Sequence, residues 1–353
     1  MADYRLRTSK GVVGVAGAAG KFLVGFLVAV ALMVVGCKQR PEEATKPTSV
    51  TLESVALCRS TTALLPMVVA EKQGFFAEQG LTVTVRESIM GKEALEGMLR
   101  GECDFATAAE PPVVEYARQR DDFRLLGALQ NSDNLNRIVA RADRGIAKPE
   151  DLRGKRIATA KGTAPHYFLE LFLEKHGLEP KDIKIVFMKS DELLAALTSG
   201  QVDAVSMTNN IVTKAQQALQ ANAVLMEEPG LCRNYYLLLA TTNLLEKRPE
   251  VVARFLRALL KTEEFIKQKP DEALAIVLAS QGQKESSAEI KQLLAGYQYR
   301  LSLEHSMLMG LEDMARWTGQ QAGESQRSIP NFLNLIAAEP LRTVKPEAVR
   351  LEK

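Results

Sequence analysis

The sequence has few of the residues on which most catalytic and metal sites depend. Its 353 residues include only three histidines and four cysteines, and aromatic residues make up 6% of the chain. No Cys/His spacing typical of a zinc or iron site is present, so neither a metal nor another cofactor is expected. The formal net charge is +2 and no basic run is interleaved with aromatics, so no nucleic-acid partner is expected.

The motifs of common enzyme classes are missing as well. The chain has no G-x-S-x-G, G-x-x-x-x-G-K-[ST], G-x-G-x-x-G or H-E-x-x-H pattern. Ser60 or Ser206 can meet His166 across a cleft, but the sequence offers no third residue to orient such a pair. We therefore expect a protein that is not an enzyme.

Three of the cysteines, Cys58, Cys103 and Cys232, are irregularly spaced and give no disulfide framework. Cys58 ends one predicted strand and Cys103 begins another, which places them at opposite ends of a parallel sheet and too far apart to bridge. These cysteines are expected to be small buried hydrophobic residues.

The N-terminus has the pattern of an export signal. Basic residues precede the apolar run FLVGFLVAVALMVVG, which is too short for a comfortable membrane span and has the length of a signal-peptide core. The following VVGC resembles a bacterial lipobox, in which the cysteine is lipidated. Residues 1–36 are thus predicted to be a lipoprotein signal peptide, Cys37 the lipidated residue, and 37–49 a flexible tether. The alternative is a plain signal anchor with an incidental cysteine.

Beyond the tether, short β-branched runs alternate with amphipathic helical patterns, which predicts an α/β fold with parallel-rich sheets. The spacing of glycine and aspartate occurs twice. One unit has a helix ending at Gly101 with Asp104 three residues on, and the other has Gly200 followed by Asp203. The glycines suit helix C-termini, and the repeat predicts duplicated lobes.

Two predicted strands, 136–141 and 235–242, lie where the chain passes between the lobes and returns. Beyond Pro249 the patterns are nearly all helical, including the stretch SAEIKQLLAGYQYRL. Lobe 1 is thus predicted at 50–133 plus 238–353, and lobe 2 at 134–237.

Ligands of open α/β sheets bind beyond the carboxyl ends of the strands, where helices begin. Arg59 and neighbouring hydroxyls can hold an anion, or Arg59 can face solvent beside ordinary caps. Thr163 is predicted to cap a helix, and His166 either contacts the ligand or lies on the helix surface. Glu110 can bind an amine, pair with arginine or face solvent. The ligand-binding residues expected from these loops are Arg59, Ser60, Thr61, Gly91, Glu110, Gly162, Thr163, Ala164, His166, Thr208 and Asn209.

Several stretches resemble the extracytoplasmic solute-binding proteins of ABC importers in the nitrate, sulfonate and taurine class. They are AEKQGFFAEQGLTVTV, GECDFATAAEPPV, DLRGKRIATAKGT and LLAALTSGQVDAV, in this order within about residues 50–240. The resemblance implies a two-lobed periplasmic-binding-protein fold of type II-like architecture that closes around a small solute. Ser-Met-Thr-Asn-Asn stands where many relatives have a W-E-P-like stretch, which leaves the ligand's identity open.

The resemblance further implies delivery of the solute to a membrane permease driven by an ATPase. With the lipid anchor predicted from the N-terminus, the protein is expected to be a monomer outside the cytoplasm. A small anionic solute such as a sulfonate, nitrate or taurine is expected, bound without chemical change. The alternatives are a ligand-sensing module for a signalling receptor, a protein that binds a thiamine-precursor pyrimidine or another aromatic solute, and an enzyme on the same fold.

Overall fold

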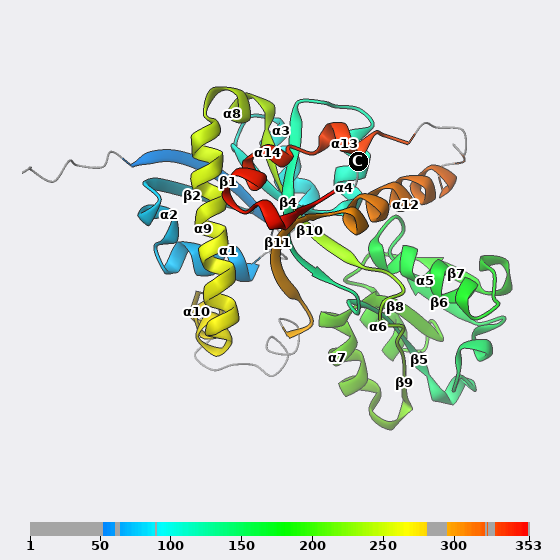
Figure 1. Cartoon of the computed structure of the whole chain (residues 1–353). Helices are drawn as coiled ribbons and strands as arrows, with labels where there is room; N and C mark the ends of the chain where they lie inside the picture. The colour runs from blue at the N-terminus through cyan, green and yellow to red at the C-terminus, as the bar shows by residue number, and fades with distance from the viewer. Residues whose placement is uncertain are drawn as a thin grey trace, which may run out of the picture. The chain divides into compact units, whose positions relative to one another are not determined.

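The computed structural model describes residues 52–60, 64–88, 90–280, 295–321, 323 and 329–351. The predicted signal peptide and tether, the lipidation of Cys37, and Thr61 fall outside this part of the chain. Val50–Lys353 forms one compact unit, which contains two β-sheets (Figure 1). Within the described ranges, no helix is both long and apolar enough to cross a membrane.

The larger sheet has seven strands in the order β12-β11-β4-β10-β3-β1-β2. Its strands are β1 (Glu53–Ser60), β2 (Leu81–Ser88), β3 (Phe105–Ala109), β4 (Phe123–Ser132), β10 (Asn234–Thr241), β11 (Gln298–Glu304) and β12 (Val349–Arg350). The helices of this lobe, called lobe 1 below, are α1 (Leu64–Lys72), α2 (Phe75–Glu78), α3 (Gly91–Leu99), α4 (Glu110–Ala117), α8 (Thr242–Lys247), α9 (Pro249–Gln268), α10 (Pro270–Ser280), α12 (His305–Gln321), α13 (Phe332–Leu335) and α14 (Ala338–Val344).

The smaller sheet has five strands in the order β7-β6-β8-β5-β9. They are β5 (Asn136–Arg141), β6 (Arg156–Thr159), β7 (Lys184–Phe187), β8 (Ala204–Thr208) and β9 (Ala223–Met226). With α5 (Ala164–Lys175), α6 (Leu193–Thr198) and α7 (Asn209–Leu219) they form lobe 2. The exact residue limits predicted for the lobes remain predictions.

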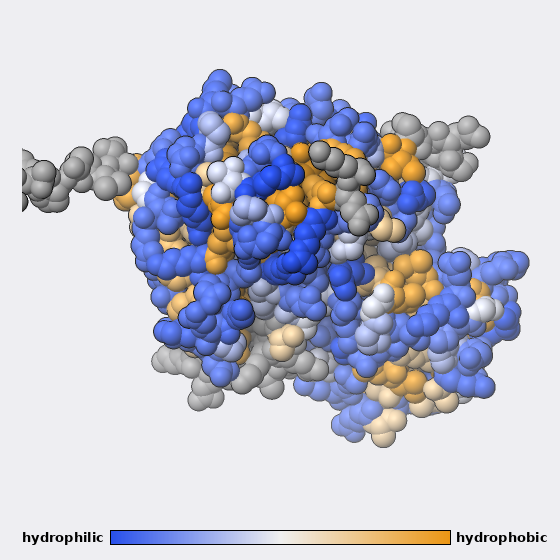
Figure 2. Space-filling model, viewed as in Figure 1, coloured by the Kyte–Doolittle hydropathy of each residue, from blue (hydrophilic) through white to orange (hydrophobic). Residues whose placement is uncertain are grey.

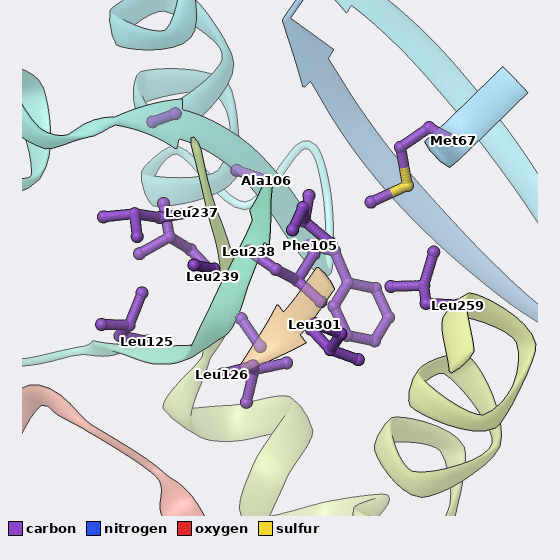
Figure 3. Close-up of a cluster of buried hydrophobic side chains, with 14 of the residues drawn as sticks. Met67, Phe105, Ala106, Leu125, Leu126, Leu237, Leu238, Leu239, Leu259 and Leu301 are labelled. Atoms are coloured by element: carbon purple, nitrogen blue, oxygen red, sulfur yellow. The ribbon is translucent and has the colours of Figure 1, made fainter. Parts of the chain in front are cut away.

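Alternation along the strands builds separate cores on the two faces of the smaller sheet. Ile157 packs in one core with Phe172 of α5, whereas the next residue, Ala158, packs in the other with Leu197 of α6. Lobe 1 has a larger core between its sheet and helices. There Phe105 of β3 stacks on Phe255 of α9 with ring centroids 4.0 Å apart. Figure 3 shows Phe105 among other buried side chains of this core, such as Leu238 and Leu259. Figure 2 shows that hydrophilic residues cover most of the visible surface around this core.

The predicted repeat is present in three dimensions. Gly101 and Gly200 both have positive φ, +81° and +76°, as glycines after helix ends do. Asp104 Oδ2 then accepts a hydrogen bond from the N–H of Ala56 at 2.8 Å, and Asp203 Oδ2 accepts one from Arg156 N–H at 2.9 Å. Each aspartate therefore fastens the first strand of a βαβ unit, β1 in lobe 1 and β6 in lobe 2.

The sheets are mixed, because the strands next to the lobe crossings run antiparallel. β1 pairs in parallel with β2 and β3, and β6 with β7 and β8, whereas β10 and β5 are antiparallel to their neighbours. The two crossings lie side by side. Asn136 Nδ2 donates to Asn234 Oδ1 at 2.8 Å, and the Gly230 N–H donates to the Asp133 carbonyl at 3.0 Å.

The prediction that the C-terminal region is helical is wrong around residue 300. The stretch that begins at Gln298 forms β11, which pairs antiparallel with β4, and β12 adds a parallel partner. Leu301, Ser302 and Leu303 are all buried in this strand. The segment forms a strand because it pairs with the edge of the lobe 1 sheet at β4, and this pairing overrides its helical pattern.

The prediction that Cys58 and Cys103 cannot bridge is also wrong. They form a disulfide with their Cα atoms 5.7 Å apart. Cys103 is not part of β3, which begins only at Phe105, and the chain reaches that strand from helix α3 on the face to which the Cys58 side chain points. A Cβ built on Gly97 of α3 would be 3.0 Å from Cys58 Sγ, which shows how closely this helix covers the cysteine.

Candidate functional site

A cavity of about 620 Å³ lies where loops of both lobes meet. Its wall combines the start of α3, the β3–α4 junction and the C-terminal end of α4 from lobe 1 with the turn before α5 from lobe 2. Tyr236 of β10 and Thr318 of α12 complete it. The lining residues are Met90, Gly91, Lys92, Ala109, Pro111, Pro112, Glu115, Arg118, Gln119, Lys161, Gly162, Thr163, Ala164, Tyr236 and Thr318.

Four of the predicted ligand residues, Gly91, Gly162, Thr163 and Ala164, line this cavity. Gly91 is needed for close packing of α3 on β3, because a Cβ there would lie 2.9 Å from the Ala108 Cα. Gly162 has φ +73°, a left-handed conformation that few other residues adopt easily. The structure therefore brings turns of both lobes together at one site.

Thr163 occupies the N-cap position of α5, as predicted, but its hydroxyl does not cap the helix. Instead, Thr163 Oγ1 donates to the Ala160 carbonyl at 2.6 Å and stabilises the turn. No side chain of the described residues caps α3 either, where Met90 is the N-cap. Both helices thus begin at the cavity with backbone N–H groups that no side chain occupies.

Arg59 and Ser60 lie at the end of β1 but do not line the cavity. The buried Arg59 pairs with Glu87, its neighbour in the β1–β2 register, and lies 3.6 Å from Glu71. The Ser60 N–H donates to Thr107 Oγ1 on β3 at 2.9 Å. Their side chains are thus engaged with neighbouring elements of lobe 1, and a direct role in ligand binding stays a prediction.

Glu110 is turned away from the cavity into the protein. Its side chain is buried, and Oε1 accepts a hydrogen bond from the Tyr235 N–H at 2.8 Å. Oε2 has no hydrogen-bond partner among the described residues, and Glu110 lines a second cavity of about 280 Å³ together with Tyr167 and Ser306. Burial raises the pKa of Glu110 to about 8, against the opposing effect of its own backbone N–H and that of Tyr235.

The other three predicted residues lie behind or beside the cavity. His166 is fully buried, two residues into α5. Thr208 ends β8, and Asn209 begins α7 with its N–H bonded to the Leu135 carbonyl at the lobe crossing. None of these three lines the cavity.

Arg118, at the end of α4, is a cavity residue that the sequence reasoning missed. Its Nη2 donates to the Ala315 carbonyl of α12, and its buried Nε has no hydrogen-bond partner among the described residues. No carboxylate lies within ion-pair distance of Arg118 in the described structure. No sequence motif distinguishes Arg118 from Arg120, two residues later. Which of the two faces the cavity depends on how the chain leaves the C-terminal end of α4.

The remaining lysines of the cavity differ in how far their charge is neutralised. Lys92 Nζ forms an ion pair with Glu115 Oε1 at 2.9 Å, so a carboxylate compensates its positive charge. Lys161 Nζ lies 5.6 Å from the centre of the Phe187 ring, a cation–π contact that leaves its positive charge uncompensated. The cavity therefore has a positive side at Arg118 and Lys161, and apolar walls at Met90 and Pro111.

Two α/β lobes joined by two crossings, with a cavity between their loops, define the periplasmic-binding-protein fold. Solved structures confirm it. The sulphonate-binding protein SsuA of Escherichia coli matches 80% of this chain and 97% of its own, with a TM-score of 0.67 and 17% identity. SsuA of Xanthomonas axonopodis, solved with bound MOPS, has a TM-score of 0.61 at 19% identity and covers 85% and 98% of the two chains. The desulfurization enzyme DSZB shares the fold, with a TM-score of 0.56 at 16% identity over 84% and 99% of the two chains.

The profile of the NMT1/THI5-like family matches residues 61–273, and the chain belongs to that family. A Bacillus subtilis protein named for binding aliphatic sulfonates is 27% identical over 215 residues, which are 60% of this chain and 65% of the relative. The taurine-binding periplasmic protein of Escherichia coli is 27% identical over 224 residues, 60% and 66% of the two chains. The chain thus matches just under two thirds of the length of these relatives, and the predicted resemblance to sulfonate- and taurine-binding proteins is confirmed.

Proposed function

We propose that this protein is the solute-binding component of an ABC importer and holds a small organic anion of the sulfonate or taurine type in the 620 Å³ cavity. One observation carries the proposal. Two cations without a carboxylate partner, Arg118 and Lys161, line the same cavity as the N-termini of α3 and α5, which no side chain caps. Guanidinium groups and helix N-termini are favourable partners for an oxyanion. The names of the relatives point to the same ligand class.

The apolar part of the wall favours a solute with a carbon body. Pro111 and Pro112 have no N–H to offer an anion, and with Met90 and Tyr236 they form surface that suits an alkyl or aryl group. A cavity of this size is large for nitrate alone. An organosulfonate fills both the cationic and the apolar parts of the site.

The proposal includes the cellular arrangement predicted from the N-terminus. The protein is exported, anchored by lipid on Cys37 outside the cytoplasm, and works as a monomer that presents its solute to a permease and its ATPase. The Cys58–Cys103 disulfide supports an oxidising compartment, since such bonds persist mainly outside the cytoplasm. A sensor role would use the same cavity with a receptor as partner.

Catalysis of the kind suggested by the desulfurization-enzyme fold neighbours receives no support from the cysteines of the described structure. Cys58 and Cys103 are joined to each other, and burial raises the pKa of the Cys232 thiol to about 12. A protonated thiol is a poor nucleophile. Binding without turnover is the function that these residues favour.

Calorimetry with a panel of ligands tests the proposal. Wild-type protein is titrated with an alkanesulfonate, an arylsulfonate, taurine, nitrate and an aminopyrimidine, and one organosulfonate should bind most tightly. Arg118→Gln should weaken that binding about 10- to 100-fold, as expected for a lost charge-assisted hydrogen bond. Arg120→Gln is the matched control, because Arg120 pairs with Asp122 outside the cavity.

If the pyrimidine binds and the sulfonates do not, the ligand class is wrong. If Arg118→Gln and Lys161→Gln bind the sulfonate as tightly as wild type, the anion does not lie at the proposed place. Release of a chemically altered product from any tested compound would contradict a pure binding role.

A further inference from the structure

His166 connects the ligand turn of lobe 2 to a helix of lobe 1. The side chain is fully buried, and its Nδ1 accepts a hydrogen bond from the N–H of Gly162 at 3.3 Å. The ring lies between two aromatic side chains, with centroid distances of 4.9 Å to Phe187 and 5.0 Å to Trp317, both edge to face. His166 thus lies directly behind the turn that lines the cavity.

The donor in this hydrogen bond fixes the protonation of the ring. Because the Gly162 N–H donates, Nδ1 has to be the unprotonated nitrogen, and the proton of the neutral ring is on Nε2. That nitrogen is 3.2 Å from Glu170 Oε1, one helical turn along α5, in contact but outside hydrogen-bond geometry. The imidazole is therefore held by Gly162 on one side and faces a carboxylate on the other.

Glu170 extends the connection to α12 of lobe 1. Trp317 Nε1 donates to Glu170 Oε2 at 2.7 Å, and Gln321 Nε2 donates to Oε1 at 2.8 Å. Burial on its own would raise the pKa of Glu170, but the contacts with His166, Trp317 and Gln321 lower it below its usual value. The carboxylate is thus favoured in its charged form, in which it accepts from both α12 donors.

The series of contacts that begins at Gly162 ends at a lobe 1 residue next to the cavity wall. Thr318, the residue after Trp317, lines the cavity, as Gly162 does in lobe 2. A continuous series of contacts, from Gly162 through His166 and Glu170 to Trp317, therefore joins the two walls behind the ligand site (Figure 1 shows α5 and α12). Trp317 is the only tryptophan in the sequence, so the tryptophan emission of the protein reports on the surroundings of this one indole, which include Glu170, His166 and Tyr167.

We propose that His166 is a positioning residue: it orients the Lys161–Thr163 turn for the solute and couples that turn to the Glu170–Trp317 contact between the lobes. The solute does not touch His166. This inference rests on the proposed function of the cavity, because it assigns the turn a ligand to hold. A rise in solute occupancy should therefore alter the surroundings of Trp317 without direct contact between the solute and the indole.

Three substitutions of His166 separate its two contacts. Asparagine places an oxygen near the position of Nδ1 and can still accept from Gly162. Glutamine keeps a polar group only toward Glu170, and leucine keeps neither. If Nδ1 positions the turn, His166→Asn should bind the organosulfonate within about threefold of wild type, while His166→Gln and His166→Leu bind it at least tenfold more weakly. Equal affinity in His166→Leu and wild type would overturn the inference.

Two further measurements on the full chain give results independent of that affinity. Hydrogen exchange followed by mass spectrometry should show faster exchange at Gly162 in the leucine and glutamine variants without any ligand, and wild-type protection in the asparagine variant. Unchanged exchange in His166→Leu overturns the positioning role even if no tested solute binds. Emission of Trp317 should shift when the wild type binds solute, and Glu170→Gln should reduce that shift. Solute binding by calorimetry with no emission change overturns the coupling and leaves the proposed function standing.

Discussion

Replacing Glu110 by glutamine is expected to stabilise the protein near pH 8 and to have little effect near pH 5. The buried carboxyl has a pKa of about 8 in the folded protein, raised by burial from an ordinary value of 4.5. Between these two values the folded protein keeps a proton that the unfolded chain has lost. The free energy of unfolding therefore falls as the pH rises from 4.5 to 8, and it stays at the lower level above that range.

The size of the effect follows from the width of this window. Each pKa unit is worth about 1.4 kcal/mol, so the wild type should lose up to roughly 4–5 kcal/mol across it through this one group. Glutamine has nearly the same shape and no charge, and its amide oxygen can accept from the Tyr235 N–H as Oε1 does now. The variant should therefore lack this component of the pH dependence.

Urea unfolding at several pH values between about 5 and 8 measures the difference. The stability of Glu110→Gln relative to wild type should increase steadily with pH, with similar m-values for the two proteins. Glu246→Gln is the control, because Glu246 is an exposed residue of α8 and its variant should run parallel to wild type. Parallel profiles for Glu110→Gln and wild type would refute the reasoning, since the carboxyl would then ionise at the same pH in both states.

Other consequences of the structure can be measured in the same way. Gly91→Ala should lower the free energy of unfolding by roughly 1–3 kcal/mol, because the new methyl group meets the backbone of Ala108, and an unchanged urea midpoint would contradict this. The double variant Cys58→Ala, Cys103→Ala should have a free energy of unfolding lower by roughly 2–5 kcal/mol, since the disulfide closes a sequence separation of 45 residues. A reducing agent should then lower the thermal midpoint of the wild type but not that of the double variant. Asp203→Asn should destabilise the protein above about pH 4 but not in stronger acid, because the hydrogen bond from Arg156 lowers the pKa of Asp203 and its contribution is lost as the pH falls; pH-resolved unfolding tests this.

Local patterns in the sequence were sufficient to predict the βαβ units and the repeat. Gly101 follows the end of α3 and Asp104 lies just before β3, so their places in the chain follow from spacing, whereas the strand that Asp104 fastens, β1, lies far back in the sequence. The turn at Gly162 was predicted for the same reason, since it joins a strand directly to its helix. The helix end at Gly101 and the turn at Gly162 both depend on contacts that are short in sequence.

What the sequence did not predict depends on register and on long-range pairing. The pairing of Arg59 with Glu87 depends on the β1–β2 register, and no local pattern reveals that register. The strand β11 exists because β4, far away in the chain, offers it an edge. Arg118 faces the cavity only because of the direction in which α4 ends, and Cys103 reaches Cys58 because the chain enters β3 from the helix layer.

The paired aspartates also matter for protein engineering. Because Asp104 and Asp203 each fasten a strand inside their own lobe, lobe 2 carries the contacts that define its fold and can be treated as an exchangeable cassette. The joints for such a graft are the two short crossings, near Asp133 and Gly230, which already hydrogen-bond to each other. A donor lobe from a relative would recombine one half of the ligand wall with the other. It would need a hydrogen-bond acceptor at the position of Glu170 to meet Trp317, so donor lobes without one would lose this contact.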